Sequence, residues 1–181
     1  KPLFEDGQVP ENSEAGFQLI SVDADGARIA MPGISWSLVK VERNYQWYRQ
    51  GNSWNYEVVD FTTEIADFEI DVAHDAPASL SAIVDWGRYR LDVTGAEGAE
   101  SSVLFDAGWH VESKSIETPD GLEIALDKES YKVGDIAQLR ISPRFAGEAL
   151  ITVGSERLIE TVTATVDEAG TTVDLPVTEE W

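Results

Sequence analysis

The chain of 181 residues contains no cysteine, few basic side chains and no long apolar run. Without cysteine it can form neither a disulfide framework, nor a zinc–thiolate site, nor a cysteine nucleophile. A helix that spans a bilayer needs about 18 or more apolar residues in succession, so we expect no direct insertion into a membrane. No window shows the 3.6-residue apolar periodicity of an amphipathic helix.

Basic residues are scarce relative to acidic ones. The chain has 34 acidic and 13 basic side chains and a formal net charge of -21. Such a charge repels phosphate, which excludes nucleic acid as an expected partner. Both halves of the chain are acidic, so neither is a charged tail. Six tryptophans, five tyrosines and six phenylalanines supply enough apolar surface for a folded core.

Apolar and polar residues alternate with a period of two in many short segments, which is typical of strands with one buried face. The segments with this pattern are 67–72, 88–93, 122–126, 137–142, 161–166 and 172–177. Turn signals such as Asp25-Gly26 and Gly51-Asn52 separate such runs, and Pro176 indicates a strand end or an edge strand. We therefore predict an all-β fold of two tandem antiparallel β-sandwiches, similar to immunoglobulin or fibronectin type III domains.

The pattern predicts one sandwich over residues 1–115 with roughly eight strands, and a second over 116–181 with about five. Residues 112–121 have the composition of a linker. Five strands are fewer than the ~7 of an immunoglobulin-like sandwich, so we expect the second domain to be incomplete and the chain to be a piece of a larger protein. The side chains expected to be buried are Trp86, Tyr89, Leu91, Val93, Phe105 and Trp109 in the first domain, and Leu126, Tyr131, Leu139, Ile141, Ile151 and Val153 in the second.

Residues with catalytic chemistry are few. The two histidines, His74 and His110, lie near loop signals and lack a G-x-S-x-G elbow, so we interpret them as surface histidines. The carboxylates Asp67, Glu69 and Asp71 share one strand face and have the spacing of a glycosidase pair. An exposed face would leave them solvated, and we favour that interpretation.

The segment Asp23-Ala24-Asp25-Gly26 begins like a calcium loop. It lacks the further acidic or amide ligand and the glutamate that would close such a loop, and a hairpin turn explains it equally well. We expect no metal and no cofactor.

An aromatic cluster occupies residues 36–56 and comprises Trp36, Tyr45, Trp47, Tyr48, Trp54 and Tyr56. Exposed rings stack on sugars, so the cluster supports an alternative function as a carbohydrate-binding or adhesive module. The parity of the rings on either side of Gly51-Asn52 is also typical of cross-strand pairs in a hairpin, and we favour packing over ligand binding.

The second half carries a family signature. Residues 125–139 read ALDKESYKVGDIAQL and resemble the D-K-x-x-Y-x-x-G-D-x-A-x-L pattern of macroglobulin-like domains, and residues 143–153 and 175–181 continue the bacterial version. In the first half, residues 86–93, Phe105 and Gly108-Trp109 look like the end of a preceding domain of the same kind. The residues that carry the resemblance are Trp86, Gly87, Tyr89, Leu91, Gly108, Trp109, Asp127, Lys128, Tyr131, Gly134, Asp135, Ala137, Leu139 and Gly147.

The chain therefore resembles part of a bacterial alpha-2-macroglobulin. The resemblance implies a large inhibitor that traps a protease after the protease has cut a bait segment. Many members use a Cys–Gln thioester, which this cysteine-free chain cannot contain, and the second domain is expected to lead toward the bait-bearing part. We expect a non-enzymatic, monomeric scaffold segment whose partners are the other domains of its parent chain and, through the parent, proteases. The family also implies a periplasmic or cell-envelope location, with a lipid anchor on the parent.

Overall fold

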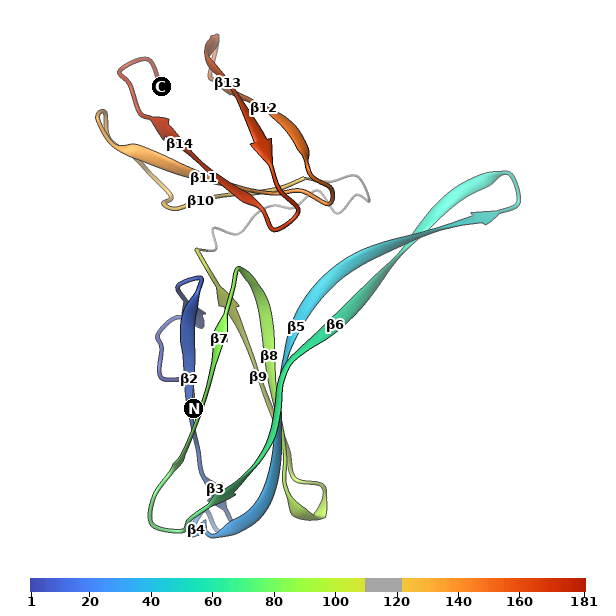
Figure 1. Ribbon diagram of the computed structural model, residues 1–181, viewed down its shortest axis with the longest axis vertical. Helices are drawn as coiled ribbons and strands as arrows, with labels where there is room; N and C mark the ends of the chain where they lie inside the picture. Colours follow the sequence, from blue (N-terminus) through green and yellow to red (C-terminus); the bar gives the residue numbers. More distant parts are fainter. Residues whose placement is uncertain (110–121) are drawn as a thin grey trace. The chain divides into compact units, whose positions relative to one another are not determined.

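The computed structural model describes residues 1–109 and 122–181, without the side chains of residues 43–45, 58 and 97 (Figure 1). The chain divides into two compact units, residues 1–108 and 109–181, each of which is described by itself. Both consist of β-strands, which confirms the predicted all-β fold. No helix in the described residues is long and apolar enough to cross a membrane. The predicted boundary at residue 115, the linker 112–121 and His110 lie outside the described residues.

The first unit contains nine strands within residues 1–109, where roughly eight were predicted over 1–115. Three of the nine are two-residue strands. The strands are β1 (Gln8–Val9), β2 (Ser13–Leu19), β3 (Ser21–Val22), β4 (Arg28–Ile29), β5 (Met31–Gln50), β6 (Ser53–Val72), β7 (Ala78–Val84), β8 (Gly87–Thr94) and β9 (Glu100–Ala107).

Seven of these strands form a five-stranded sheet in the order β1-β9-β8-β5-β6 and a second sheet of β2 and β7, while β3 and β4 pair with each other. The pairs are antiparallel as predicted, except that β1 pairs with β9 in parallel. The core lies between the two sheets. Phe17 from β2 and Phe105 from β9 meet there with ring centroids 5.3 Å apart, and Tyr89 and Leu38 are almost completely buried.

One hairpin of the first unit extends well beyond its sheet. Strands β5 and β6 have 20 residues each and pair along nearly their whole length. Strand β8 pairs with β5 only from Ser35 to Val41, so the distal parts of β5 and β6 pair only with each other. Figure 1 shows this two-stranded ribbon curving away from the sandwich. Gly51 takes the positive φ of 64° that the predicted turn requires.

The second unit has five strands in residues 122–181, as predicted. They are β10 (Glu123–Leu126), β11 (Ile136–Ser142), β12 (Gly147–Gly154), β13 (Leu158–Val166) and β14 (Thr171–Pro176). A three-stranded sheet β10-β11-β14 and the antiparallel pair β12-β13 enclose its core. Strand β14 lies at the edge of its sheet and ends at Pro176, in agreement with the prediction for that proline.

The predicted cores are confirmed at their centres and are partly exposed at their margins. Tyr89, Leu91 and Phe105 are buried in the first unit, and Leu139 and Ile141 in the second. The remaining predicted core residues are only half-buried, and they are Trp86, Val93, Trp109, Leu126, Tyr131, Ile151 and Val153. Two further residues with core parity, Phe68 on the edge strand β6 and Ile124 on the edge strand β10, are exposed, because an edge strand is covered along one side only.

Candidate functional site

The residues that could have carried out catalysis do not converge. His74 is exposed and lies 3.9 Å from Asp75. Asp67, Glu69 and Asp71 are exposed along β6, in agreement with the solvated face that the sequence favours, and Asp71 Oδ1 accepts a hydrogen bond from the Gly33 N–H at 2.8 Å. Nothing in their surroundings holds two carboxylates in a buried pair.

The candidate calcium segment is a tight hairpin turn. Asp23 Oδ1 accepts hydrogen bonds from the backbone N–H groups of Asp25 and Ala27 at 3.0 and 2.9 Å. The turn joins β3 to β4, as the Asp25-Gly26 signal predicted. Over residues 1–109 and 122–181 no three His, Cys, Asp or Glu side chains gather as metal ligands would.

The aromatic cluster separates into one core residue and one exposed set. Trp36 is buried in the first core. Trp47 and Tyr56 lie directly opposite each other on the distal ribbon with ring centroids 5.7 Å apart, which confirms the predicted cross-strand pairing. The side chain of Tyr45 lies outside the described part. The other rings of the ribbon, Tyr48 and Trp54 included, are exposed to solvent rather than buried in a core.

One signature residue of the first unit, Tyr89 near the start of β8, contacts Asp85 and Lys40. The Tyr89 hydroxyl donates a hydrogen bond to the Asp85 carboxylate, and Lys40 Nζ lies 3.0 Å from the same carboxylate. The Lys40 ammonium also lies 5.9 Å from the centroid of the Tyr89 ring. This arrangement ties the turn before β8 to β5, the strand next to it.

Two signature glycines have positions that other residues could not occupy without strain. Gly108 has a φ of 97°, and a Cβ at this position would collide with the Trp86 ring. Gly87 has a φ of 151°, and a Cβ there would approach Cε of Lys40 to 2.6 Å. These glycines therefore permit close packing at one end of the β8–β9 pair, where Gly87 lies opposite Ala107.

The second unit contains the same kind of Asp–Tyr pair, again with the tyrosine four positions after the aspartate. The Tyr131 hydroxyl donates to Asp127 Oδ1 at 2.7 Å, and the N–H of Gln138 on β11 donates to the same oxygen at 2.8 Å. Lys128 Nζ lies 5.8 Å from the Tyr131 ring centroid. Asp127 thus joins the loop that precedes β11 to that strand.

The turn Gly134-Asp135 closes the loop before β11. Gly134 has a φ of 93°, and its N–H donates to the Val177 carbonyl at 2.8 Å. Asp135 Oδ2 accepts a hydrogen bond from the Lys132 N–H at 2.9 Å. Ala137 and Leu139 then enter the core of the unit, while Gly147 begins β12.

Burial and hydrogen bonds together shift the pKa values of the two Asp–Tyr pairs. Burial alone would raise the pKa of Asp85, but hydrogen bonds from Tyr89 and Lys40 outweigh it and lower the pKa. Burial would likewise raise the pKa of Asp127, and hydrogen bonds from Gln138 and Tyr131 lower it. Burial and the neighbouring carboxylate raise the pKa of both tyrosines, so both hydroxyls remain protonated donors at neutral pH.

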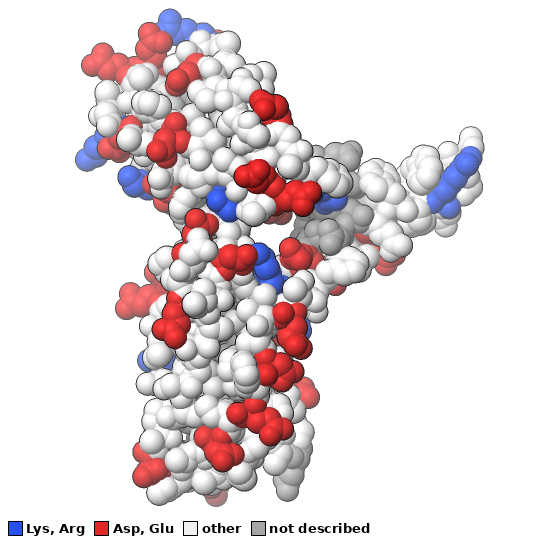
Figure 2. Space-filling view, in the orientation of Figure 1, with Lys and Arg blue, Asp and Glu red and all other residues white. Residues whose placement is uncertain are grey.

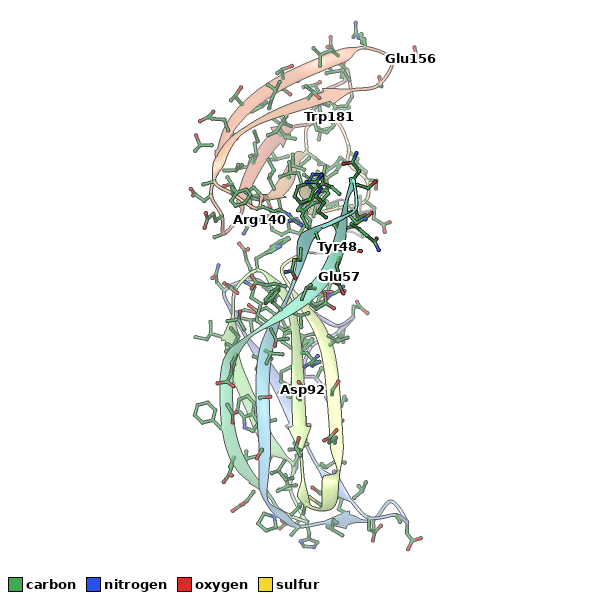
Figure 3. All side chains as sticks on the ribbon, turned by 90° about the vertical axis from the view of Figure 1, so that its right-hand side faces the viewer. Tyr48, Glu57, Asp92, Arg140, Glu156 and Trp181 are labelled. Carbon is green, nitrogen blue, oxygen red and sulfur yellow. The ribbon has the colours of Figure 1, made fainter. Side chains whose placement is uncertain are left out.

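Arg140 is a residue that the sequence pattern assigned incorrectly. Alternation along β11 placed it on the wet face, yet it is buried. Its Nη2 donates to the Ala169 carbonyl at 2.7 Å, and its Nη1 to Thr172 Oγ1 at 3.3 Å, so it holds the turn between β13 and β14 (Figure 3). Gly170 in that turn has a φ of 87°, and a Cβ there would meet the guanidinium. The sequence signals that could have indicated its burial were an arginine within an apolar strand and the later turn at Ala169-Gly170.

Both units match domains of one protein family. Residues 1–109 match the family model "Bacterial macroglobulin domain 6", and residues 122–181 match "Alpha-2-macroglobulin bait region domain". The chain belongs to the bacterial alpha-2-macroglobulin family. The comparison describes the second unit as the bait region domain, where the sequence led us to expect a stretch leading toward it.

Relatives with curated names agree with this assignment. The chain is 32% identical over 189 residues to "Alpha-2-macroglobulin" of Xylella fastidiosa (strain 9a5c) and 30% identical over 179 residues to "Alpha-2-macroglobulin" of Escherichia coli (strain K12). The alignments cover 100% and 96% of this chain but 11% of each relative. The chain thus spans about one ninth of the length of these alpha-2-macroglobulins.

Solved alpha-2-macroglobulin structures share the fold. The native conformation of the Escherichia coli protein aligns over 100% of this chain and 12% of its own, with a TM-score of 0.58 and 28% identity. The Salmonella protein reacted with methylamine aligns over the same shares of the two chains, with a TM-score of 0.56 and 26% identity.

Proposed function

We propose that this chain is a non-catalytic scaffold segment of a bacterial alpha-2-macroglobulin that encloses proteases after they cut its bait region. The observation that carries the proposal is how the signature residues Tyr89, Asp127 and Tyr131 are engaged. Asp85 and Tyr89, and again Asp127 and Tyr131, form hydrogen bonds with each other and with neighbouring backbone, as structural residues do. The match of the two units to consecutive domain models of one family supports it further.

The role of the segment within the parent follows from the separate cores of its two units. Each unit has its own core, so each can move as one body when a cleaved bait allows the parent to rearrange. The second unit is the part of the chain that matches the bait region domain, and the first unit precedes it in the sequence. Partners of the segment are then the remaining domains of the same polypeptide, and proteases meet it through the parent.

The test uses the full-length parent protein. We would mix it with a broad-specificity protease and follow cleavage of a large protein substrate and of a small peptide. Protection of the large substrate alone is expected, because an enclosed protease still admits a peptide. Equal cleavage of both substrates with two different proteases would overturn the trapping function.

A variant of the same protein distinguishes a scaffold role from a direct chemical role of the β6 carboxylates. Replacing Asp67, Glu69 and Asp71 together by alanine removes the exposed carboxylates of β6. Full protection of the large substrate is expected in this variant. Loss of protection with an unchanged unfolding midpoint would mean that these carboxylates take part directly, and the non-catalytic role would be wrong.

We further propose that the parent resides in the periplasm or cell envelope, held by a lipid anchor. The support is the family resemblance alone. Cell fractionation with an antibody to the parent should find it in the envelope fraction and release it with detergent. Recovery with the cytosol would contradict this location.

A further inference from the structure

The distal part of the β5–β6 hairpin has two different faces. In the strand register Trp47 lies opposite Tyr56, and Arg49 lies opposite Trp54. Since alternate residues of a strand point the same way, these four side chains share one face, which we call the aromatic face. The opposite face carries the pairs Gln46–Glu57, Tyr48–Asn55 and Gln50–Ser53.

The aromatic face is exposed to an extent that is unusual for such large rings. Trp54 is 66% exposed, Trp47 47% and Tyr56 42%. No neighbouring strand runs beside these rings, since β8 pairs with β5 only as far as Val41 and the distal strands pair only with each other. A two-stranded ribbon is only marginally stable by itself in water, so a ribbon of this length benefits from a surface to pack against. Contiguous exposed aromatic patches mark interaction sites.

The charge of this region is opposite to that of the molecule. Residues 46–56 contain one arginine and no carboxylate, whereas the whole chain has a net charge of -21. Figure 2 shows one basic side chain at the far end of the hairpin and acidic ones over the sandwich below it. Tryptophan, tyrosine and arginine are the residue types that dominate protein–protein hot spots. A basic, aromatic tip therefore complements an acidic protein surface.

The length of the polypeptide identifies where such a surface is available. The chain covers 11–12% of the alpha-2-macroglobulins that it matches, so nearly nine tenths of such a parent lies outside it. Domains of the same polypeptide are present at a high effective concentration, which favours an intramolecular contact over a contact with a separate molecule. We propose that the aromatic face of the hairpin docks onto an acidic surface of another domain of the parent alpha-2-macroglobulin. The contact holds the first unit in place within the assembled protein. This proposal rests on membership of the family and does not depend on the trapping of proteases.

The experiment places a photocrosslinker on either face of the hairpin in the full-length parent. Tyr56 and Tyr48 make a matched pair, since both are tyrosines, they are 42% and 45% exposed, and they lie on opposite faces of one ribbon (Figure 3 labels Tyr48). Each is replaced in turn by benzoylphenylalanine, and the products after irradiation are mapped by mass spectrometry. We expect position 56 to crosslink within the same polypeptide to one acidic surface of another domain, at a yield several-fold above that of position 48.

A second pair of variants tests the composition of the contact. Trp54→Ser removes a ring from the aromatic face, whereas Asn55→Ser changes the next residue, on the other face. Trp54→Ser should lower the crosslink yield from position 56 several-fold. Asn55→Ser should leave this yield within about twofold of its value without the second substitution.

Other results would overturn the proposal. Equal yields from positions 48 and 56, or no crosslink within the chain, would mean that the aromatic face is not docked. A crosslink between two copies would make the face an oligomer contact. Suppression of the crosslink by added oligosaccharide would indicate that the rings bind glycans. None of these results bears on protection of a large substrate, so failure here is distinct from failure of the proposed trapping function.

Discussion

The two units contain the same Asp–Tyr arrangement and use it differently. In the first unit Tyr89 is 0% exposed and belongs to the core, and its partner Asp85 lies at the surface beside Lys40. In the second unit Tyr131 and Asp127 are both half-buried, and Asp127 also accepts the N–H of Gln138. The same spacing therefore anchors a core tyrosine in one sandwich and a loop in the other.

The difference follows from the size of the two sandwiches. The first has a five-stranded sheet that covers Tyr89 on both sides, with Phe105 stacked 5.5 Å away. The second has five strands in all within the described part, so its margins stay open. A motif can thus keep its hydrogen bonds while its share of the hydrophobic free energy depends on the surrounding sheets.

The largest expected effect is the loss of the core tyrosine. Tyr89→Ala should destabilise the first unit by about 3–5 kcal/mol, as for other large core aromatics. Tyr131→Ala should cost about half as much in the second unit, because less of the ring is buried. Urea unfolding of both variants measures the difference. Equal losses would mean that the hydrogen bonds, and not burial, determine the contribution of the motif.

A core leucine tests whether the smaller unit has a core of its own. Leu139 is buried among the residues of the second core, so Leu139→Ala should cost about 2–5 kcal/mol. Leu150 on β12 is 69% exposed and serves as the control. Leu150→Ala should cost less than about 0.5 kcal/mol, and a similar value for Leu139→Ala would show the core assignment to be wrong.

Removing the carboxylates should reverse the order of the two units, so that the larger loss of unfolding free energy occurs in the second unit. Asp127→Ala leaves a backbone N–H and a tyrosine hydroxyl without their acceptor, which should cost about 1–3 kcal/mol. Asp85→Ala should cost about 1 kcal/mol or less, since its ion pair with Lys40 is at the surface and the Tyr89 hydroxyl keeps the backbone carbonyl of residue 85 as an acceptor. The same urea titrations provide the comparison, and a larger loss for Asp85→Ala would contradict it.

Acid should weaken both units through these carboxylates. Each has a pKa that is lower in the folded state than in the unfolded chain, so its stabilisation is present above the unfolded pKa of about 3.9 and is lost as the pH falls through the folded value. Unfolding midpoints measured from pH 6 to pH 2 should therefore fall less steeply in Asp127→Asn and Asp85→Asn than in the parent. Parallel curves would exclude this contribution.

The smallest effect is expected at the hairpin, for which the described second unit has no counterpart. Trp47→Ala should change the unfolding free energy of the sandwich by less than about 0.5 kcal/mol, because the ring lies outside the core. Trp36 is buried at the base of the same strand, and Trp36→Ala should cost about 3–5 kcal/mol. Similar values for the two would mean that the ribbon and the sandwich unfold as one.

Much of the fold was readable from local pattern. The period of two located β8, β11, β13 and β14, and Asp25-Gly26 and Gly51-Asn52 marked real hairpin turns. The pattern failed where a residue's surroundings come from distant chain. Arg140 has outward parity yet is buried against the β13–β14 turn, and Phe68 has inward parity yet is exposed on an edge strand. Parity reports which face a side chain joins, and it does not report what covers that face.

The sequence named candidate signature residues but not their geometry. The signature named Asp127, Tyr131 and Gly134 without indicating that Asp127 accepts from β11. The aromatic cluster was visible as a hairpin, but its rings were expected to be packed. The rings are exposed because the pairing of β8 with β5 ends at Val41, well short of the turn.

By itself the sequence determined the strand period, the turns, the acidic charge and the family signature, because each of these depends on residues that are close together in the chain. The tertiary structure decided which faces are covered. It buried Tyr89 and left Tyr131 half-open, buried Arg140, and carried the rings of the β5–β6 hairpin beyond the sheet. Burial depends on strands that meet from distant parts of the chain, and that is information which no local pattern contains.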